Sequence, residues 1–197
     1  RYTEYTITYK GKQATTSGTN ITVKIVPTDS ANWNEQTKTF TVSKVNKLTA
    51  TNTVSISGTS TFGQTLTANV TTNSNGTKSY QWYYATSKDA TSGTDISGAT
   101  SSTYTIGNVS STSMVGKYIG CKVTIAAGTN WNAHTGATAT TQTAVAKAAP
   151  TVTLSAASGT VDYDATKTFT VTASVAGSMA VTSSSTDVTV TGGNGDL

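Results

Sequence analysis

Apolar and polar residues alternate in short stretches along the whole chain, and this alternation constrains the fold more than any other feature. Residues 5–9 place Tyr, Ile and Tyr at every second position, residues 21–25 place Ile, Val and Ile, and residues 40–42 place Phe and Val. A period of two is typical of a β-strand with one buried face. No stretch of ordinary helix length shows helical periodicity. We therefore expect an all-β fold.

The residue types agree with this expectation. Thr, Ser, Gly and Asn fill many of the remaining positions. Thr, Val, Ile and Tyr favour extended backbone, because β-branched and aromatic side chains fit a pleated, half-buried surface. With 197 residues, the chain is long enough for one large domain or two smaller ones.

The pattern of charges argues against a nucleic-acid partner, and the pattern of apolar residues argues against membrane insertion. The net charge of +4 is spread as single lysines, and Arg1 is the only arginine. Nucleic-acid-binding proteins usually cluster Lys and Arg on one face, whereas isolated lysines on strands keep a sheet soluble and protect its edges. No apolar run is long enough to cross a bilayer. We expect neither a nucleic-acid partner nor direct membrane insertion.

Residues 53–148 carry the densest series of predicted strands. About seven are expected, separated by turn sequences such as NSNG and TSGTD. The positions predicted to point inward are Leu66, Ala68, Val70, Tyr80, Trp82, Tyr84, Tyr104, Ile106, Ile119, Cys121, Val123 and Ile125. This segment has the right size for one complete two-layer sandwich.

The tripeptide Asn-Trp-Asn occurs twice, each time between two predicted strands. Aligning residues 23–25 with residues 123–125 brings the two copies into register, apart from two extra residues in the first. Both should therefore mark the corner between the penultimate and last strands of a sandwich. We expect Trp33 and Trp131 to cap the open end of a core, because an indole buries a large ring while its N–H reaches water or backbone. Such internal repetition indicates a modular array.

The sequence YQWYY, followed by TDISGATSSTYTIGNV and VGKYIGCKVTIAAGTNWN, resembles the immunoglobulin-like repeats of large bacterial cell-surface proteins. The resemblance covers residues 53–148. The segments VKIVPTDSANWNEQTKTFTV and TVTLSAASGTVDYDATKTFTVTASV resemble other bacterial immunoglobulin-like repeats. The resemblance implies tandem β-sandwiches that act outside the cell as stalks, spacers or adhesive modules, and it gives Trp82 the packing role of the strand-C tryptophan.

We predict four parts: a closing half of a sandwich at residues 1–45, a linker at 46–52, a complete sandwich at 53–148, and an opening half at 149–197. Neither half is large enough to bury both faces of a core. The closing half of one copy should complete the opening half of the next, either between repeats of one polypeptide or between subunits that add strands to each other. Head-to-tail contacts of this kind build filaments.

Catalytic and metal-binding residues are sparse. His134 is the only histidine and is expected in a surface loop, while Glu4 and Glu35 are the only glutamates. No nucleophile–base pair and no facing carboxylates are recognisable. Asp162 and Asp164 should share one face of a strand, where they would make at most a weak calcium site; charge beside a turn is the preferred interpretation. We predict no enzyme activity, no cofactor and no metal.

Cys121 is the only cysteine, so the chain forms no internal disulfide. Its neighbours in the alternation, Ile119 and Val123, point inward. We expect Cys121 to be a small buried hydrophobe in the core rather than a reactive thiol.

The function expected from these features is a non-catalytic structural or adhesive module on the extracellular cell surface. Its partners would be other copies or neighbouring repeats of the same protein, with a surface glycan or a host protein as further partners. The alternative is a carbohydrate-binding module, in which Tyr83 and Tyr118 would form a small exposed patch on outer strand faces. A third hypothesis is a decoration protein on a virus-like particle.

Overall fold

The computed structural model describes residues 3–190 and is all-β, without any α-helix in that range. The strands are β1 (Thr19–Ile25), β2 (Gln36–Val42), β3 (Asn52–Ser57), β4 (Thr65–Thr72), β5 (Lys78–Ala85), β6 (Thr94–Asp95), β7 (Thr103–Thr105), β8 (Tyr118–Ile125), β9 (His134–Thr140), β10 (Val152–Leu154) and β11 (Val171–Ala173). Within the described residues, no helix is long and apolar enough to cross a bilayer. The chain divides after Ala146 into two compact units.

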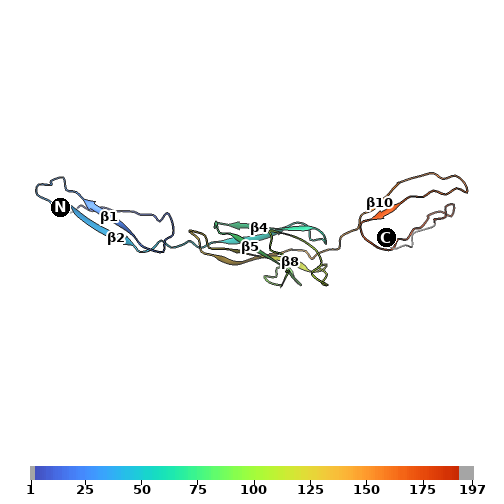
Figure 1. Ribbon diagram of the computed structural model, residues 1–197, viewed down its shortest axis with the longest axis horizontal. Helices are drawn as coiled ribbons and strands as arrows, with labels where there is room; N and C mark the ends of the chain where they lie inside the picture. The colour runs from blue at the N-terminus through green and yellow to red at the C-terminus, as the bar shows by residue number, and fades with distance from the viewer. Residues whose placement is uncertain (1–2, 191–197) are drawn as a thin grey trace. The chain divides into compact units, whose positions relative to one another are not determined.

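Strands β3 to β9 form the middle sandwich, which consists of two antiparallel sheets (Figure 1). One sheet has three strands in the order β3-β4-β7, and the other has four in the order β6-β5-β8-β9. The number agrees with the prediction of about seven strands between residues 53 and 148. However, β6 (Thr94–Asp95) lies in TSGTD, which was predicted to be a turn.

The core of the middle sandwich lies between its two sheets. Leu66 and Ala68 of β4 and Trp82 of β5 belong to one buried cluster. Trp82 is fully buried, its ring lies 5.7 Å from the ring of Tyr104, and its N–H donates a 2.8 Å hydrogen bond to the carbonyl of Ser101. A buried indole is stable only when its N–H finds such a partner. The predicted inward position of Trp82 is confirmed.

The register between β5 and β8 places the predicted core residues opposite one another. Trp82 lies opposite Cys121, and Tyr80 lies opposite Val123. Cys121 and Val123 are fully buried, while Tyr80 is partly buried against the same cluster. A slip of one residue would turn every side chain to the other face, so this pairing confirms the predicted register.

The closing half contains one hairpin, β1–β2, in which Ile21 lies opposite Phe40. Residues 5–9 were predicted to form a strand, but they join no ladder within the described part of the chain. That prediction is wrong for this structure, because a strand requires a hydrogen-bonding partner as well as an alternating pattern. The segment is held by the ring of Tyr9, whose centre lies 5.6 Å from that of Phe40.

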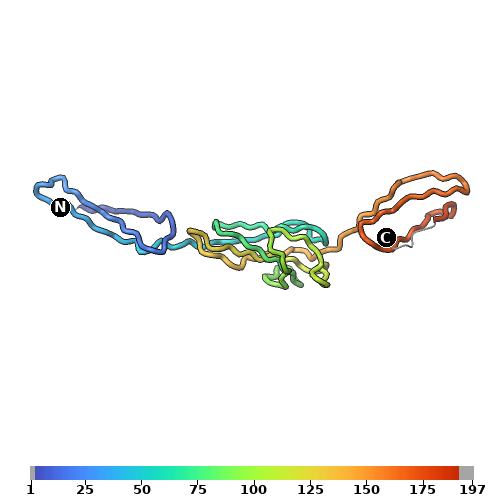
Figure 2. The backbone as a smooth tube through the Cα atoms, viewed as in Figure 1, coloured from blue at the N-terminus to red at the C-terminus, as the bar shows by residue number. Residues whose placement is uncertain are grey.

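The opening half contains the short hairpin β10–β11. Its backbone runs out and back as a long loop between the two strands (Figure 2). The alternation of Phe169, Val171, Ala173 and Val175 predicts one strand, and Val188 and Val190 predict another. The first is shortened to β11, so that prediction is wrong in extent, and residues 188–190 form no strand, so the second prediction is wrong. Two paired strands alone are only marginally stable. The predicted half runs to residue 197, and residues 191–197 lie outside the described residues.

Candidate functional site

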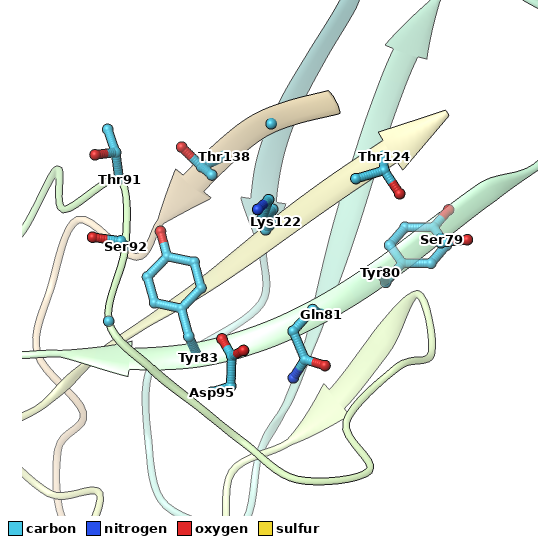
Figure 3. Close-up of a pocket in the computed structure, with 12 residues that line it drawn as sticks. Ser79, Tyr80, Gln81, Tyr83, Thr91, Ser92, Asp95, Lys122, Thr124 and Thr138 are labelled. Atoms are coloured by element: carbon cyan, nitrogen blue, oxygen red, sulfur yellow. The ribbon is translucent and has the colours of Figure 1, made fainter. Parts of the chain in front are cut away.

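The outer face of the four-stranded sheet carries a groove of about 550 Å³. Strands β5, β8 and β9 contribute its floor, and residues 91–93 of the loop between β5 and β6 contribute one side (Figure 3). Its side chains include Ser79, Gln81, Tyr83, Thr91, Ser92, Asp95, Lys122, Thr124 and Thr138. Most of these side chains carry a hydroxyl, amide or charged group, while apolar atoms, including those of Tyr80 and Tyr83, make up the larger share of the exposed lining.

Tyr83 is covered at this groove and does not form an exposed patch. It is only 2% exposed, and its hydroxyl donates a 2.7 Å hydrogen bond to the carbonyl of Ala90. Burial raises the pKa of this hydroxyl. The alternation places Tyr83 on the outer face, but the loop after β5 folds over that face. The prediction that Tyr83 is exposed is wrong for this reason.

Gly120 explains how the Tyr83 ring fits against the sheet. The two residues lie directly opposite each other on β8 and β5. A Cβ atom on Gly120 would clash with the Tyr83 ring. Glycine inside a strand often marks a close approach of another group. Gly120 is thus the sequence signal from which a covered tyrosine could have been inferred.

Tyr118 is half-buried and lies two residues before Gly120, opposite Ala85. It is not among the residues that line the groove. Because Tyr83 is covered, the two tyrosines do not form a joint exposed surface. The predicted two-tyrosine patch is absent from the described structure.

The groove offers polar groups but no open aromatic platform among the residues that line it. The side-chain nitrogen of Gln81 already donates to two backbone carbonyls, at 2.8 and 3.0 Å. Asp95 and Lys122 are exposed, and Tyr80 packs against the core cluster. Sugar-binding sandwiches usually need an exposed ring face, so this groove would have to bind a ligand through hydrogen bonds and charge.

His134 was predicted to lie in a surface loop. That prediction is wrong, because His134 is the first residue of β9 and lies opposite Ile125. It is half-buried, and its Nδ1 atom is buried without a hydrogen-bond partner. Among the described residues, no group of three or more His, Cys, Asp or Glu side chains is placed to hold a metal ion. Nδ1 of His134 therefore lacks the orienting hydrogen bond that a catalytic histidine usually receives.

Asp162 and Asp164 lie in a turn and not on a strand. The amide of Ala165 donates a 3.1 Å hydrogen bond to the carbonyl of Asp162, and Asp164 has a φ of 61°. Aspartate tolerates this left-handed conformation better than most residues. The predicted placement of both carboxylates on one strand face is therefore wrong, because this part of the backbone is a turn.

The two Asn-Trp-Asn tripeptides mark equivalent corners, as predicted. One connects β1 to β2, and the other connects β8 to β9, in each case between antiparallel neighbours. However, Trp33 is 68% exposed, so the prediction that it caps a core is wrong. Trp131 is half-buried and lies outside the buried core cluster, and its backbone forms a bridge with Leu48. A cap requires a core beneath it, and the closing half has none of its own.

Cys121 is fully buried in the core, as predicted. Burial raises the pKa of its thiol to about 11. A thiol with this pKa is almost wholly protonated at neutral pH, whereas the thiolate is the reactive form. Cys121 therefore contributes packing to the core.

Large apolar side chains are exposed only outside the middle sandwich. Within the described residues, all of them lie before residue 49 or after residue 151. They are Tyr5, Ile7, Tyr9, Ile25, Val26, Trp33, Phe40 and Leu48 in the first group, and Val152, Leu154, Val161, Tyr163, Phe169, Val175, Val181, Val188 and Val190 in the second. Contiguous exposed apolar patches often mark interaction sites.

The hairpin β1–β2 repeats the hairpin β8–β9. In the first, the amide of Thr15 donates a 3.0 Å hydrogen bond to the carbonyl of Val45. In the second, the amide of Gly116 donates a 2.8 Å hydrogen bond to the carbonyl of Val145. Both bonds lie at the end opposite the Asn-Trp-Asn corner. The two hairpins thus share their corner and their closing hydrogen bond.

The hairpin β10–β11 corresponds in the same way to β3–β4. In both, two apolar residues of the first strand lie opposite two apolar residues of the second. The pairs are Val152–Ala173 and Leu154–Val171 in one hairpin, and Val54–Val70 and Ile56–Ala68 in the other. In the middle sandwich, β3–β4 and β8–β9 belong to different sheets. Each terminal hairpin therefore matches a part of a different layer.

Comparisons with known proteins add no relative. No protein-family model, no curated protein and no solved structure matches the chain. What the chain does must therefore be inferred from its own residues, and two features stand out. One is the groove on the four-stranded sheet, and the other is the exposed apolar surface of the two terminal hairpins.

Proposed function

We propose that the chain is a non-catalytic structural or adhesive module of an extracellular array, such as a stalk, a fibre or a surface-layer repeat. Its units would be immunoglobulin-like sandwiches, in line with the sequence resemblance. The array would be held together by contacts between neighbouring copies, and these copies would be repeats of one polypeptide or separate subunits.

The strand order of the middle sandwich supports the immunoglobulin-like interpretation. Its sheets of three and four strands keep the first strand, β3, in one layer and the last strand, β9, in the other. The segment between β3 and β4 is also hydrogen-bonded to the segment that follows β9. The amide of Phe62 donates a 2.9 Å hydrogen bond to the carbonyl of Ala146. Seven strands in two facing antiparallel sheets are typical of this class.

The observation that carries the proposal is the distribution of exposed apolar residues. The middle sandwich buries its large apolar side chains, whereas both terminal hairpins leave theirs in solvent. The hairpins carry the same alternation as their counterparts in the sandwich, so their faces are built to be covered. A hairpin alone is only marginally stable, and an unpaired edge readily adds a strand from another chain.

If copies associate end to end, the closing half of one copy and the opening half of the next cover each other's exposed apolar faces. The closing half of one copy lacks the layer that the opening half of another copy supplies. Because the two surfaces differ, each copy retains one free surface of each kind after pairing. Contacts of this heterologous type propagate into filaments instead of closing into a dimer.

The proposal is tested by calorimetry on a two-copy polypeptide, in which two full chains are joined in series. Its junction would bring one opening half and one closing half together into an additional sandwich. A domain of about 100 residues adds roughly 60–80 kcal/mol of unfolding enthalpy. We expect the two-copy polypeptide to exceed twice the single-chain enthalpy by an amount of this order.

The matched control is a two-copy polypeptide whose second copy lacks residues 1–45. It keeps both middle sandwiches but cannot complete the junction, so its unfolding enthalpy should equal twice that of the single chain. If the intact two-copy polypeptide also shows only twice the single-chain value, the halves do not complete each other and the proposed array is wrong.

Carbohydrate binding is the second candidate, and the groove on the four-stranded sheet is the observation that favours it. Asp95 and Lys122 offer exposed charges there, with threonine and serine hydroxyls nearby. A glycan array distinguishes the two functions. Binding that is lost in Lys122→Ala and kept in Tyr118→Ala would assign a sugar site to the groove, because Tyr118 does not line it.

A further inference from the structure

Resting on the proposed function, we infer that residues 3–9 form an intermolecular β-strand. This strand would add to the free edge of residues 165–171, the segment that leads into β11, in a neighbouring copy. The two segments would run antiparallel, with Tyr5 opposite Phe169. The partner is thus a second copy of this chain, and the docking surface is a defined strand edge with a defined register.

Residues 3–9 have the properties of a strand that lacks its partner. They alternate as Tyr5, Ile7 and Tyr9, yet they join no ladder within residues 3–190. Tyr5 is 73% exposed and Ile7 is 55% exposed. Residues with strong β-propensity thus stay in solvent here, without pairing with any described strand.

The middle sandwich contains a paired version of this segment. Strand β7 includes Tyr104 and Thr105 and is followed by Ile106, which repeats the Tyr-Thr-Ile order of residues 5–7. The elements that follow also agree, since β7 precedes β8 and β9 as residues 3–9 precede β1 and β2. Residues 3–9 are therefore the counterpart of β7 in the closing half.

The partner of β7 in the middle sandwich is β4, and Leu66 lies directly opposite Tyr104. This ladder continues beyond the strands, because the amide of Ile106 donates a 2.9 Å hydrogen bond to the carbonyl of Gln64. The edge of β4 that faces β7 is thus the surface on which this strand is held. A copy of β4 with a free edge would hold a copy of β7 in the same way.

The opening half supplies that copy of β4. The sequence Thr-Phe-Thr-Val at residues 168–171 corresponds to Thr-Leu-Thr-Ala at residues 65–68. The register agrees, because Val171 lies opposite Leu154 as Ala68 lies opposite Ile56. Phe169 therefore takes the place of Leu66.

The corresponding edge in the opening half is free. Within the described residues, β11 pairs only with β10, and residues 165–170, which lead into β11, belong to no strand. Phe169 is 52% exposed, whereas its counterpart Leu66 is fully buried. Pairing with residues 3–9 would cover Phe169 with Tyr5 as Tyr104 covers Leu66. Addition of a strand to an exposed edge in this way is a common mode of recognition between proteins.

The charges of the two halves favour the same pairing. Residues 1–45 carry six basic and three acidic side chains, a net charge of +3. Residues 149–197 carry one basic and four acidic side chains, a net charge of −3. Opposite net charges attract the two halves, while two closing halves or two opening halves repel each other. A heterologous contact between copies is therefore preferred over a symmetric one.

Disulfide trapping tests the register. Residues opposite each other in an antiparallel pair have Cα atoms about 5.5 Å apart at hydrogen-bonded positions, which a disulfide can bridge. Full chains carrying Tyr5→Cys and full chains carrying Phe169→Cys are mixed and oxidised. We expect a disulfide-linked heterodimer as the main product, and at least a tenfold lower yield when Thr172→Cys, three residues out of register, replaces Phe169→Cys. Cys121 is buried and should not compete.

The same pair is also placed in the two-copy polypeptide, with Phe169→Cys in the first copy and Tyr5→Cys in the second. An internal disulfide that forms there but not between separate chains supports the inference for copies joined in one polypeptide. Equal yields for the in-register and out-of-register pairs, or no disulfide in either format, overturn it. If the extra unfolding enthalpy of the junction is nevertheless present, only the register is wrong; if it is absent too, the proposed array also fails.

Discussion

The middle sandwich and the terminal hairpins carry the same strand patterns with opposite degrees of burial. Ile125 at the end of β8 is 1% exposed, and its counterpart Ile25 at the end of β1 is 50% exposed. Leu66 and its counterpart Phe169 differ in the same direction. The residue types are alike, so the difference comes from the second layer, which is present in one region and missing in the other.

This difference shows that an alternating pattern determines which side chains share one face of a strand, but not whether a second layer covers that face. A single layer leaves its apolar face in water, where burying each large side chain would be worth about 1.5–3 kcal/mol. Burying the exposed apolar faces of β1–β2 and β10–β11 would therefore favour association. Neighbouring copies would use that driving force to build the proposed array.

The largest difference between the two regions is expected when one tryptophan is removed from each. Trp82→Ala should lower the free energy of unfolding of the middle sandwich by about 3–5 kcal/mol, because it leaves a large cavity in the core. Trp33→Ala should change it by less than about 0.5 kcal/mol, because Trp33 is 68% exposed. Urea denaturation of the single chain measures both values. Similar losses for the two substitutions would break the comparison.

A smaller effect is expected on the outer face of the middle sandwich. Gly120→Ala should destabilise it by about 1–3 kcal/mol, because the added methyl group would clash with the covered ring of Tyr83. Gly107→Ala is the matched control, since a Cβ atom there meets nothing within 4 Å. A neutral Gly120→Ala variant would show that the loop over Tyr83 is not tightly packed.

The smallest effect concerns reactivity and leaves stability nearly unchanged. Cys121 on β8 and Ile21 on β1 occupy equivalent positions in the two hairpins. A thiol reagent at pH 8 should not modify Cys121 in the folded chain, because burial raises its pKa to about 11. In an Ile21→Cys variant, the introduced thiol should react at least tenfold faster. Modification at equal rates would mean that the two faces are equally accessible.

Much of the middle sandwich could be predicted from the sequence. The alternation on β5 and β8 is unambiguous, and it correctly placed Trp82 and Cys121 in the core. Tyr83 was misjudged, because alternation assigns a side chain to a face but does not show which loop covers that face. The cover depends on Gly120, which is distant in sequence and becomes informative only once its pairing with Tyr83 is known.

The terminal halves were harder to predict, for a related physical reason. Residues 5–9 have the pattern of a strand, but they form none in the described structure because their partner edge is not supplied there. Trp33 was expected to cap a core, and it is exposed because β1–β2 has no second layer above it. In both cases the sequence specifies the contact surface, and the contact depends on a second set of residues.

Hydrogen exchange tests most directly whether the two halves complete each other. In the single chain, amides of β5 and β8 should exchange slowly, whereas those of residues 3–9 and 165–171 should exchange rapidly. In the two-copy polypeptide, residues 3–9 of the second copy and residues 165–171 of the first should become protected by at least a factor of 100, while the unpaired ends remain unprotected. Unchanged exchange at the junction would contradict the proposed pairing, and so would full protection of both segments in the single chain at high dilution.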